Sequence, residues 1–393
     1  MMRSFAITFG AVGLVAVGML GLMPAAAPAA STMRAQIGAR LHHGELEAVT
    51  CLSARNCTAV GAGVSGALAE HWNGSRWATE PAPPGPGTNH FLVAVSCTSA
   101  SACTAVGDYA PKSRPKVVEL TLADRWNGKR WTHEPTPNPA GTTLAQLLGV
   151  SCSSATACIA VGVYAIPGKP SLTLAERWNG KKWAIERTPI PKGLVTATLK
   201  SVWCRSATSC IAVGDNYVTT RGLTPNPAAL AEVWNGKRWA IQPVPNPKGT
   251  DDSEFNGVSC LSATCTAVGQ YVIGVNKARP LAEVWNGKAW AVEPAANPAG
   301  SAFFQELDSV SCVRAKACTA VGHYQISRVE VTLAEGWNGA KWAIEPTPKI
   351  RSGSALIGVS CKAPRCAAVG FQHSAAVGTL AEGWNGKKWA IEP

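Results

Sequence analysis

The cysteines are the residues of this chain with the best-defined chemistry. All 14 fall into pairs whose members are five or six positions apart, and each pair flanks a short predicted turn. Zinc binding would call for nearby histidines or Cys-x-x-Cys spacing, and neither accompanies the pairs. Exported chains oxidise such pairs, so we predict seven local disulfides, each stabilising its hairpin by about 2–3 kcal/mol. The pairs are Cys51/Cys57, Cys97/Cys103, Cys152/Cys158, Cys204/Cys210, Cys260/Cys265, Cys312/Cys318 and Cys361/Cys366.

Most carboxylates, the usual acids and bases of enzymes, recur in a pattern that argues against catalysis. One acid recurs at the same place in all seven copies of a repeat, and a second ends nearly every copy. An active site needs asymmetry, so we predict a structural hydrogen bond for each acid instead. The first series is Glu70, Asp124, Glu176, Glu232, Glu283, Glu335 and Glu382; the second is Glu80, Glu134, Glu186, Glu293, Glu345 and Glu392, with Gln242 in the remaining copy.

A few loop acids break this regularity. The run Asp251-Asp252-Ser253-Glu254 could hold Ca²⁺, but it lacks a full ligand set, and a solvated loop is the preferred interpretation. A polysaccharide hydrolase or lyase would draw on Asp251, Asp252 or Asp308. The histidines are scattered, and the chain has no phosphate-binding glycine loop, nucleophile elbow or zinc motif. We therefore predict no catalytic residue, no metal and no cofactor.

Five tyrosines supply the ligand-binding hypothesis. They are assigned to one position of the repeat, after its second strand, and aromatic rings there could stack on a sugar or a peptide. The alternative is that each ring packs between neighbouring sheets and hydrogen-bonds a nearby loop. The candidate binding residues are Tyr109, Tyr164, Tyr217, Tyr271 and Tyr324.

The element that positions all of these residues is a repeat marked by Trp-Asn-Gly-x-x-Trp. Asn-Gly between residues of high strand propensity predicts a hairpin, because both residues can take a positive φ in a tight turn. Each copy also contains an apolar strand ending in Val-Ser-Cys or a close variant, and a second strand of the type Cys-Thr-Ala-Val-Gly. The copies begin at Trp72, Trp126, Trp178, Trp234, Trp285, Trp337 and Trp384, so that their spacing is 47 to 56 residues.

Four short strands in a period near fifty predict an all-β fold, a seven-bladed β-propeller with four antiparallel strands and one disulfide per blade. The predicted repeats cover residues 46–82, 91–136, 146–188, 198–244, 255–295, 306–347 and 355–393. The sequence leaves two ways in which the ring could close. Either each written repeat is one blade with Val-Ser-Cys innermost, which we prefer, or that strand is the outermost strand of the preceding blade.

The motifs carry a loose family resemblance. Strand two with its glycine, the following tyrosine and the later tryptophan resemble kelch-type propellers, and the Asn-Gly-x-x-Trp turn resembles the Asp-box turn of sialidase-type propellers. The chain is most similar to secreted bacterial propeller repeat proteins with the pattern VSC…C-AVG…LAE-WNG…W, over residues 46–393. This resemblance implies architecture and no particular activity.

The N-terminus predicts export. A basic start at Arg3, an apolar run over residues 5–23 and Ala27-Pro28-Ala29 are typical of a signal peptide over residues 1–29. An uncleaved anchor is the alternative, and only then would the protein contact a membrane. Residues 30–45 are predicted to be a linker. We expect the mature protein outside the cell or at its surface.

The two faces of the predicted disc differ. The Cys and Asn-Gly hairpins form a regular face, while the variable loops and Pro-rich connections form the other, here called the variable-loop face. The net charge is +12, and Lys or Arg flanks the Asn-Gly turns, so the hairpin face could dock an anionic cell-wall polymer, although solubility alone explains such residues. Nucleic-acid binding is disfavoured because we expect the tryptophans to lie in the core of the protein. We predict a non-catalytic binding or scaffold protein that recognises a glycan, peptide or protein through the variable-loop face.

Overall fold

The computed structural model describes residues 44–393 except 82–84, 113–117, 192, 219–225, 251, 275–276, 300–303 and 374–376. The predicted signal peptide and most of the predicted linker lie outside the described residues. In the described part the chain forms 28 strands and no helix, so it contains no helix that could cross a membrane.

The strands form seven four-stranded antiparallel sheets, and each sheet is built from four consecutive strands. Blade 1 contains β1 (Gly44–Ser53), β2 (Asn56–Gly63), β3 (Gly66–Trp72) and β4 (Trp77–Glu80); blade 2 contains β5 (Thr88–Ser99), β6 (Ala102–Ala110), β7 (Leu120–Trp126) and β8 (Trp131–Glu134); blade 3 contains β9 (Leu144–Ser154), β10 (Ala157–Ala165), β11 (Leu172–Trp178) and β12 (Trp183–Glu186).

Blade 4 contains β13 (Leu194–Ser206), β14 (Ser209–Val218), β15 (Asn226–Trp234) and β16 (Trp239–Gln242); blade 5 contains β17 (Asp252–Leu261), β18 (Thr264–Ile273), β19 (Lys277–Trp285) and β20 (Trp290–Glu293). Blade 6 contains β21 (Gln305–Arg314), β22 (Ala317–Ile326), β23 (Val329–Trp337) and β24 (Trp342–Ile344); blade 7 contains β25 (Ser354–Lys362), β26 (Arg365–His373), β27 (Val377–Trp384) and β28 (Trp389–Ile391). The predicted seven-bladed propeller is confirmed.

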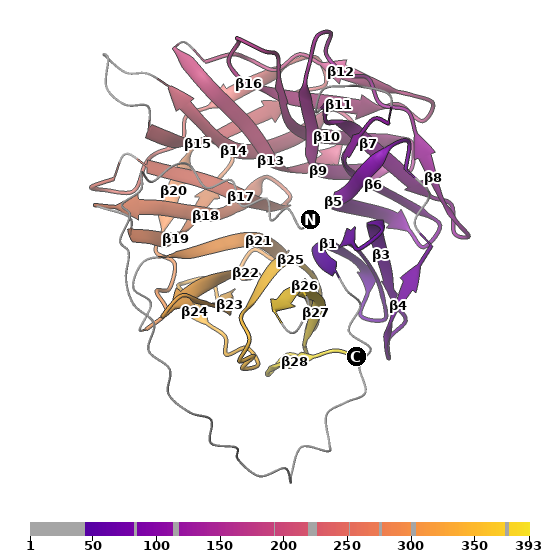
Figure 1. Cartoon of the computed structure of the whole chain (residues 1–393). Coiled ribbons are helices and arrows are strands. Elements are labelled where there is room, and N and C mark those ends of the chain that lie inside the picture. Colours follow the sequence, from indigo (N-terminus) through magenta and orange to yellow (C-terminus); the bar gives the residue numbers. More distant parts are fainter. Residues whose placement is uncertain are drawn as a thin grey trace, which may run out of the picture. The chain divides into compact units, whose positions relative to one another are not determined.

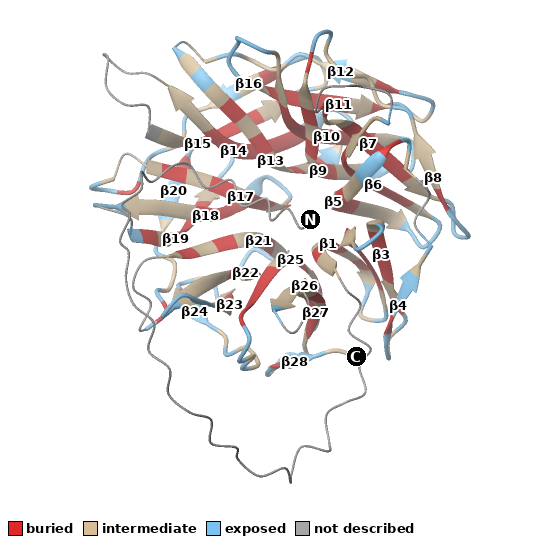
Figure 2. Ribbon diagram, viewed as in Figure 1, coloured by how far each residue is buried: buried red, intermediate tan, exposed pale blue. Residues whose placement is uncertain are grey.

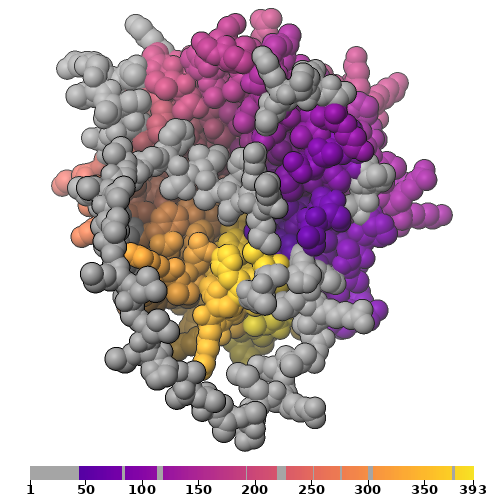
Figure 3. Space-filling view, in the orientation of Figure 1, coloured from indigo at the N-terminus to yellow at the C-terminus, as the bar shows by residue number. Residues whose placement is uncertain are grey.

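The first strand of each blade is innermost, and the ring closes between blades 7 and 1. The strands β1, β5, β9, β13, β17, β21 and β25 contact one another in that order, and β25 contacts β1 (Figure 1). The last blade, yellow, accordingly lies against the first, indigo, in the space-filling view (Figure 3). No described sheet borrows a strand from its neighbour, so each written repeat is one blade, as we preferred.

The Asn-Gly turns lie where we predicted them, but their backbone conformation differs from the prediction. Only the glycine takes a positive φ, as at Gly180 (89°). The asparagine acts through its side chain: Asn179 Oδ1 accepts hydrogen bonds of 3.0 Å from the backbone N–H groups of Lys181 and Lys182, and the same pair of bonds recurs in every blade. Such an Asx turn explains why asparagine stands here.

The tryptophans fill the seams between blades. The two rings of a pair lie 5.7 to 5.8 Å apart, and the second ring is at most 9% exposed. Seven buried clusters each combine residues of two neighbouring blades, which places the core at the seams (Figure 2). At three seams the second indole also donates to the glutamate that ends the preceding blade, as in Trp131 to Glu80 at 3.1 Å.

The predicted pairing of all 14 cysteines is confirmed. The two members of every pair are directly opposite in the β ladder and are disulfide-bonded. The seven bonds are Cys51–Cys57, Cys97–Cys103, Cys152–Cys158, Cys204–Cys210, Cys260–Cys265, Cys312–Cys318 and Cys361–Cys366.

The cysteines are also part of the core, which the prediction of hairpin staples did not include. Cys210 is 5% exposed in the cluster between blades 3 and 4, and Cys265 is 6% exposed in the cluster between blades 4 and 5. Both are site residues of the sequence prediction that the structure makes inaccessible to a ligand, so their role is structural alone. Their hairpins differ in length, because Cys210 is six positions from its partner and Cys265 is five positions from its own.

The serine of Val-Ser-Cys adds a second staple. The serine hydroxyl of one blade accepts a hydrogen bond from the cysteine N–H of the next blade, as in Cys204 to Ser151 at 2.9 Å. Trp203 replaces this serine in blade 4, where Ser201 accepts a bond of 3.3 Å from the N–H of Val258, as Ser309 does from the N–H of Val359. Disulfides therefore fix strands within a blade, and serines fix one blade to the next.

The first series of repeated acids does not make the predicted hydrogen bond in every blade. Glu335 does, because it accepts one from the N–H of Ala296 at 2.8 Å. Prolines stand at the matching position of the sequence in the five other connections, Pro83, Pro137, Pro189, Pro245 and Pro348, and proline has no N–H to donate. The carboxyl oxygens of Glu232, Glu283 and Glu382 are fully buried without a hydrogen-bond partner. Burial raises the pKa of each of these three to about 8, so they are neutral acids at pH 7.

Candidate functional site

Each innermost strand carries a β-bulge at the same place. In β21, Leu307 pairs with Gly322 and Ser309 with Val321, which leaves Asp308 without a partner in the ladder. A bulge redirects the side chain of the extra residue. Bulged residues of neighbouring blades meet, because Lys200 donates to Asn256 over 3.0 Å. We call the set the axial bulge residues: Glu47, Val93, Leu148, Lys200, Asn256, Asp308 and Ile357.

Lys200 is the centre of an ion-pair network that joins blades 4 and 5. Its ammonium lies 2.8 Å from Glu254 and 3.2 Å from Asp215. Gln270 donates to the other oxygen of Glu254 at 2.6 Å. Burial disfavours a charged lysine, but the two carboxylates outweigh it and raise the pKa of Lys200, and despite burial the same contact lowers the pKa of Glu254. Lys200 is therefore a fixed cation rather than a base or nucleophile.

His323 is the centre of a second network, in blade 6. Its Nε2 lies 3.4 Å from Glu306 Oε1 and its Nδ1 lies 3.2 Å from Asp308 Oδ2, and all three side chains are at most 16% exposed. Burial opposes a charged imidazole, but the bond and charge of Asp308 together with Glu306 raise the pKa of His323 to about 9. Burial and the charge of Asp308 raise the pKa of Glu306 to about 8. Shifts of this size are typical of functional sites.

Blade 1 adds two further carboxylates to this group. Burial, with the charges of Glu45 and Asp308, raises the pKa of Glu47 to about 7. Burial also raises the pKa of Glu45, and the charge of His373 partly offsets the effect. The pKa of Glu47 therefore depends on the charge of Asp308, although blade 7 lies between them. The axial bulge residue of blade 7, Ile357, carries no charge. The acids of blades 6 and 1 form one electrostatic unit.

The opposite side of the ring axis is different. The axial bulge residues of blades 2 and 3 are the apolar Val93 and Leu148. Outside the bulges, Gln146 donates to Glu119 at 3.1 Å and to Asp108 at 3.4 Å. Burial and the charge of Glu119 raise the pKa of Asp108 to about 7. Polar and charged bulge residues therefore cluster in blades 4, 5, 6 and 1, and this asymmetry sets the axis apart from the regular repeat.

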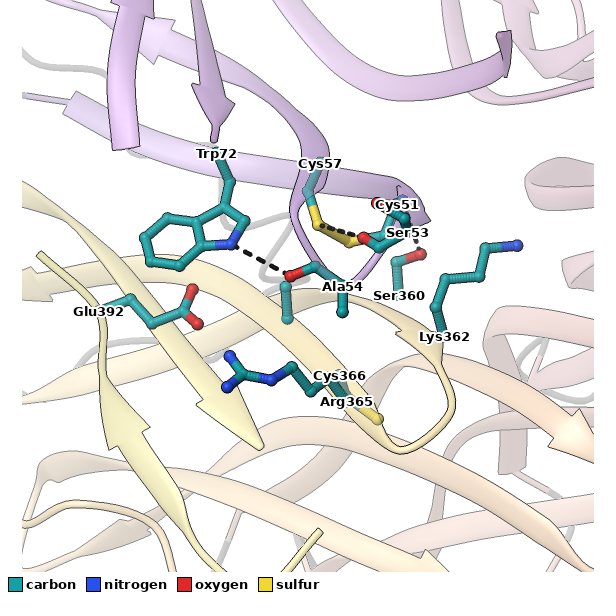
Figure 4. Close-up of a pocket in the computed structure, with 11 residues that line it drawn as sticks. Cys51, Ser53, Ala54, Cys57, Trp72, Ser360, Lys362, Arg365, Cys366 and Glu392 are labelled. Atoms are coloured by element: carbon teal, nitrogen blue, oxygen red, sulfur yellow. Dashed lines mark hydrogen bonds between the residues drawn. A yellow bond between two sulfur atoms is a disulfide. The ribbon is translucent and has the colours of Figure 1, made fainter. Parts of the chain in front are cut away.

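The cluster lies toward the variable-loop face. Every first strand runs from that face to its Cys hairpin, and Glu45 and Glu47 are the second and fourth residues of β1. Glu306 and Asp308 occupy the same places in β21. The hairpin face has its hollows elsewhere, at the seams: a cavity of about 210 Å³ lies between blades 3 and 4 beside Trp178 and Ser206, and a cavity of only about 10 Å³ lies between blades 7 and 1 (Figure 4).

The structure separates the five predicted binding tyrosines into two groups. Tyr109, Tyr164, Tyr271 and Tyr324 are half-buried and pack against the cores of the seams. Tyr217 does not share their repeat position: in its blade Asn216 pairs with Ala197, as Tyr164 does with Ala145, and Tyr217 follows one residue later. Its side chain therefore lies on the opposite face of its sheet. There, besides burial, the charges of Asp215, Glu254, Lys200 and Asp252 all influence the pKa of its hydroxyl group.

The described part of the acidic run, residues 252–254, does not converge on one point. Asp251 lies outside the described residues. Ser253 donates to Asn246 at 2.7 Å and also accepts from the N–H of Ala229, while Glu254 belongs to the Lys200 network. Asp308, which we had placed in a loop, instead lies in strand β21 at the axis.

Sequence reasoning missed Lys200, Glu306 and His323 as a group. Glu306 and His323 are 17 positions apart, and only the pairing of β21 with β22 sets them side by side. The signal that could have found them is substitution within the repeat. Position by position, blade 6 has Glu306, Asp308 and His323 where blade 7 has the apolar Ala355, Ile357 and Phe371.

The comparisons with known proteins concern fold. No protein-family model matches the chain, and no curated protein matches it in sequence. Among solved structures, it is similar to a GH74 xyloglucanase from Xanthomonas campestris, with a TM-score of 0.52 and 12% identity over 88% of this chain. This chain spans about half, 52%, of the length of that enzyme. At such identity the likeness shows the fold alone.

Two other solved propeller structures are similar at lower TM-scores. YCF48 bound to D1 peptide has a TM-score of 0.45 at 12% identity, covering 79% of this chain and 83% of that one. A six-bladed fungal lectin from Aleuria aurantia, described with a fucose recognition mode, has a TM-score of 0.42 at 12% identity, covering 76% and 94%. Neither likeness bears on the ligand of this chain.

Proposed function

We propose that this protein is an exported, non-catalytic binding module that holds a glycan, peptide or protein ligand on its variable-loop face. The observation that carries the proposal is the set of axial bulge residues. The motifs of the repeat are nearly constant from blade to blade, while this one position ranges over acid, base, amide and aliphatic side chains. Variation on a rigid scaffold is where recognition usually resides, and the bulge supplies a position that can vary without disturbing the ladder.

The seven disulfides indicate an extracellular protein, because such bonds persist in oxidising compartments. We propose further that residues 1–29 direct export and are removed. N-terminal sequencing of the protein collected from culture medium tests this. A chain that begins near Ala30 supports removal, and a chain that retains Phe5 and stays with the membrane fraction supports the anchor instead.

Glycan and peptide arrays test the binding function. Asn256→Ala alters an axial bulge residue, and Tyr164→Phe and Tyr271→Phe remove only hydroxyl groups, so that packing at the seams is kept. Lys129→Ala, on the hairpin face, is the control. We expect at least one class of array ligand to be retained by the control and to lose at least tenfold in affinity with Asn256→Ala. Ligands lost only with Lys129→Ala would contradict the variable-loop assignment, as would the absence of any array ligand.

An extracellular polysaccharide hydrolase or lyase is the second candidate. It is favoured by the raised pKa values of Glu47 and Glu306, which lie near those of general acids. Against it, both Glu306 and Asp308 are bonded to His323. Release of reducing ends from soluble β-glucan and xylan decides: activity that disappears with Asp308→Asn would establish the enzyme, and no release by the wild type would leave the binding module.

The hairpin face fits an anionic cell-wall polymer as a further partner. The 14 hairpin turns on this face hold no acidic residue. The basic residues of the Asn-Gly turns are Arg76, Lys129, Arg130, Lys181, Lys182, Lys237, Arg238, Lys288, Lys341, Lys387 and Lys388, and those of the Cys turns are Arg55, Arg205, Arg314, Lys316, Lys362 and Arg365. Because the hairpins are fixed by disulfides and Asx turns, these charges form a rigid positive surface.

Retention on immobilised polyphosphate in a salt gradient tests this partner. Lys129→Gln with Arg130→Gln should elute at clearly lower salt than the wild type. Lys277→Gln with Arg279→Gln removes the same charge from the start of β19, at the variable-loop end. Equal shifts from both double variants would show that only net charge matters and would remove the docking proposal.

A further inference from the structure

We propose that Glu306 and His323, oriented by Asp308, form a binding site for one divalent transition-metal ion, Zn²⁺ or Mn²⁺. Each of the three residues offers one ligand atom, and these atoms lie within 4.8 Å of one another. A nitrogen donor beside carboxylate oxygens is a set that these ions accept. The site lies at the axis, where Asp308 is also one of the axial bulge residues, and its test requires no other ligand.

The two ring nitrogens of His323 have different partners, and this is the arrangement that metal-binding histidines adopt. Nε2 faces Glu306 at 3.4 Å, and Nδ1 faces Asp308 at 3.2 Å. With an ion on Nε2 and Glu306, the Nδ1–H group donates to Asp308, which fixes the tautomer and the orientation of the ring. Glu306 and His323 are the ligands in this arrangement, and Asp308 is a positioning residue.

The backbone holds the site ready. Glu306 pairs with His323 in the ladder between β21 and β22, and Asp308 is the bulged residue two positions further along β21. Glu306 and Asp308 both face this histidine, while the Leu307 between them is fully buried in the seam. Such preorganisation lowers the cost of assembling ligands around an ion.

A second observation is the number of acidic side chains around His323. Glu47 of blade 1 lies within electrostatic range of Asp308. His323 is the basic partner of both Glu306 and Asp308. The contrast with blades 4 and 5 is instructive, because there Lys200 already supplies a cation to Glu254 and Asp215. A divalent ion on His323 and Glu306 would supply a comparable cation to the acids of blade 6.

Metal titration of the tag-free, full-length exported protein tests the proposal, with calorimetry and equilibrium dialysis against ZnCl₂, MnCl₂ and CaCl₂. We expect one equivalent of Zn²⁺ or Mn²⁺, at least a hundredfold weaker binding in His323→Gln and Glu306→Gln, and a loss of tenfold to a hundredfold in Asp308→Asn. Calorimetry in buffers of different ionisation enthalpy should show that the ion displaces a proton from the protein, and that His323→Gln loses this release.

The matched control is His133→Gln, because His133 also lies 3.4 Å from a carboxylate, Asp124, but outside this cluster. It should bind the ion as the wild type does, and circular dichroism checks that all variants are folded. The proposal is overturned if the wild type binds neither Zn²⁺ nor Mn²⁺, if binding survives His323→Gln, or if His133→Gln weakens it equally. In each of those cases the cluster is an ion triad with His323 as its cation, and the binding-module proposal is unaffected.

Discussion

The hydroxyl of Ser360 accepts a hydrogen bond of 2.9 Å from the N–H of Cys51, which is 309 positions away in the chain (Figure 4). The same bond joins four other pairs of neighbouring blades, with lengths of 2.9 to 3.0 Å. The seam that holds the two ends of the ring is therefore built like an internal one. Trp77 adds two bonds at this seam, from its indole to Glu392 and from its N–H to the carbonyl of Pro393.

Removing the staple at the closing seam should weaken the whole ring. Ser360→Ala leaves the N–H of Cys51 without its acceptor, and we expect a loss of about 1–3 kcal/mol in the free energy of unfolding, measured by urea denaturation. Ser151→Ala should cost a similar amount, because its bond to Cys204 is equivalent. Thr50→Ala, at the matching position of blade 1, is the control. A loss for Ser360→Ala no larger than for Thr50→Ala would contradict the role of the staple.

The glycine of each Ala-Val-Gly motif should resist substitution. A Cβ atom on Gly162 would lie 1.9 Å from the carbonyl oxygen of Gln146, since the bulge in β9 presses that carbonyl against the glycine. Gly162→Ala should therefore cost more than about 3 kcal/mol. Gly168→Ala meets nothing within 4 Å and adds only the strain of a positive φ, about 1–2 kcal/mol. Thermal melts of both variants give the comparison, and equal losses would argue against the clash.

Stability should fall as the solution becomes alkaline. Glu232 has an ordinary pKa of 4.5 when unfolded and about 8 when folded, because burial disfavours the carboxylate. The folded state then holds a proton that the unfolded state releases, so its stability is complete below about pH 4.5 and is lost progressively up to about pH 8. The slope is at most about 1.4 kcal/mol per pH unit for each such group. Glu283 and Glu382 act in the same direction.

Urea midpoints between pH 5.5 and pH 8.5 measure this effect. Glu232→Gln is neutral at every pH and nearly the same size, so its stability should decline less steeply than that of the wild type. The triple variant with Glu283→Gln and Glu382→Gln should decline least. A wild-type slope unchanged by all three substitutions would show that these carboxyls are not the source.

The disulfides should stabilise locally and independently. Closing a loop of about six residues contributes about 2 kcal/mol, so the double substitution Cys97→Ser with Cys103→Ser should lower the free energy of unfolding by that amount. The equivalent change at Cys312 and Cys318 should add to it, because the two sites are far apart in the ring. Mass spectrometry of unreduced digests should find seven links between near neighbours, and any long-range link would contradict the pairing.

The fold was predictable because its signals are local. Asn179 and Gly180 mark a turn whatever surrounds them, and Cys152 and Cys158 are brought together by the hairpin that they flank. The errors are local as well. The asparagine acts through its side chain rather than through a positive φ, and an extra residue after Gly214 shifts Tyr217 to the other face of its sheet.

The burial of the sulfurs was harder to predict than their pairing. Cys210 and Cys265 pair with near neighbours in the chain, but each is enclosed by side chains of the preceding blade, some fifty positions earlier. A hairpin signal contains no information about that neighbour. The prediction therefore identified these cysteines as staples and missed their place in the core.

The axial site was not predictable in the same way, because it depends on pairing between strands and on contact between blades. Nothing near Lys200 in the chain points to Glu254, which is 54 positions away. One sequence signal was present nonetheless. A glycine inside a strand often marks a bulge or a close approach of backbone, and Gly322 of blade 6 does both, because a Cβ there would meet the carbonyl of Glu306. The glycine predicts the bulge, and the residue types around it then indicate which blades are polar.

Because every sheet consists of four consecutive strands, the boundaries of a blade are also boundaries in the gene. An in-frame duplication or deletion of about fifty codons would add or remove one whole blade with its disulfide, its Asx turn and its half of two staples, and would leave no sheet incomplete. Unequal recombination between copies can therefore exchange one axial side chain for another in a single event. The side chains at the axis can therefore change during evolution one blade at a time.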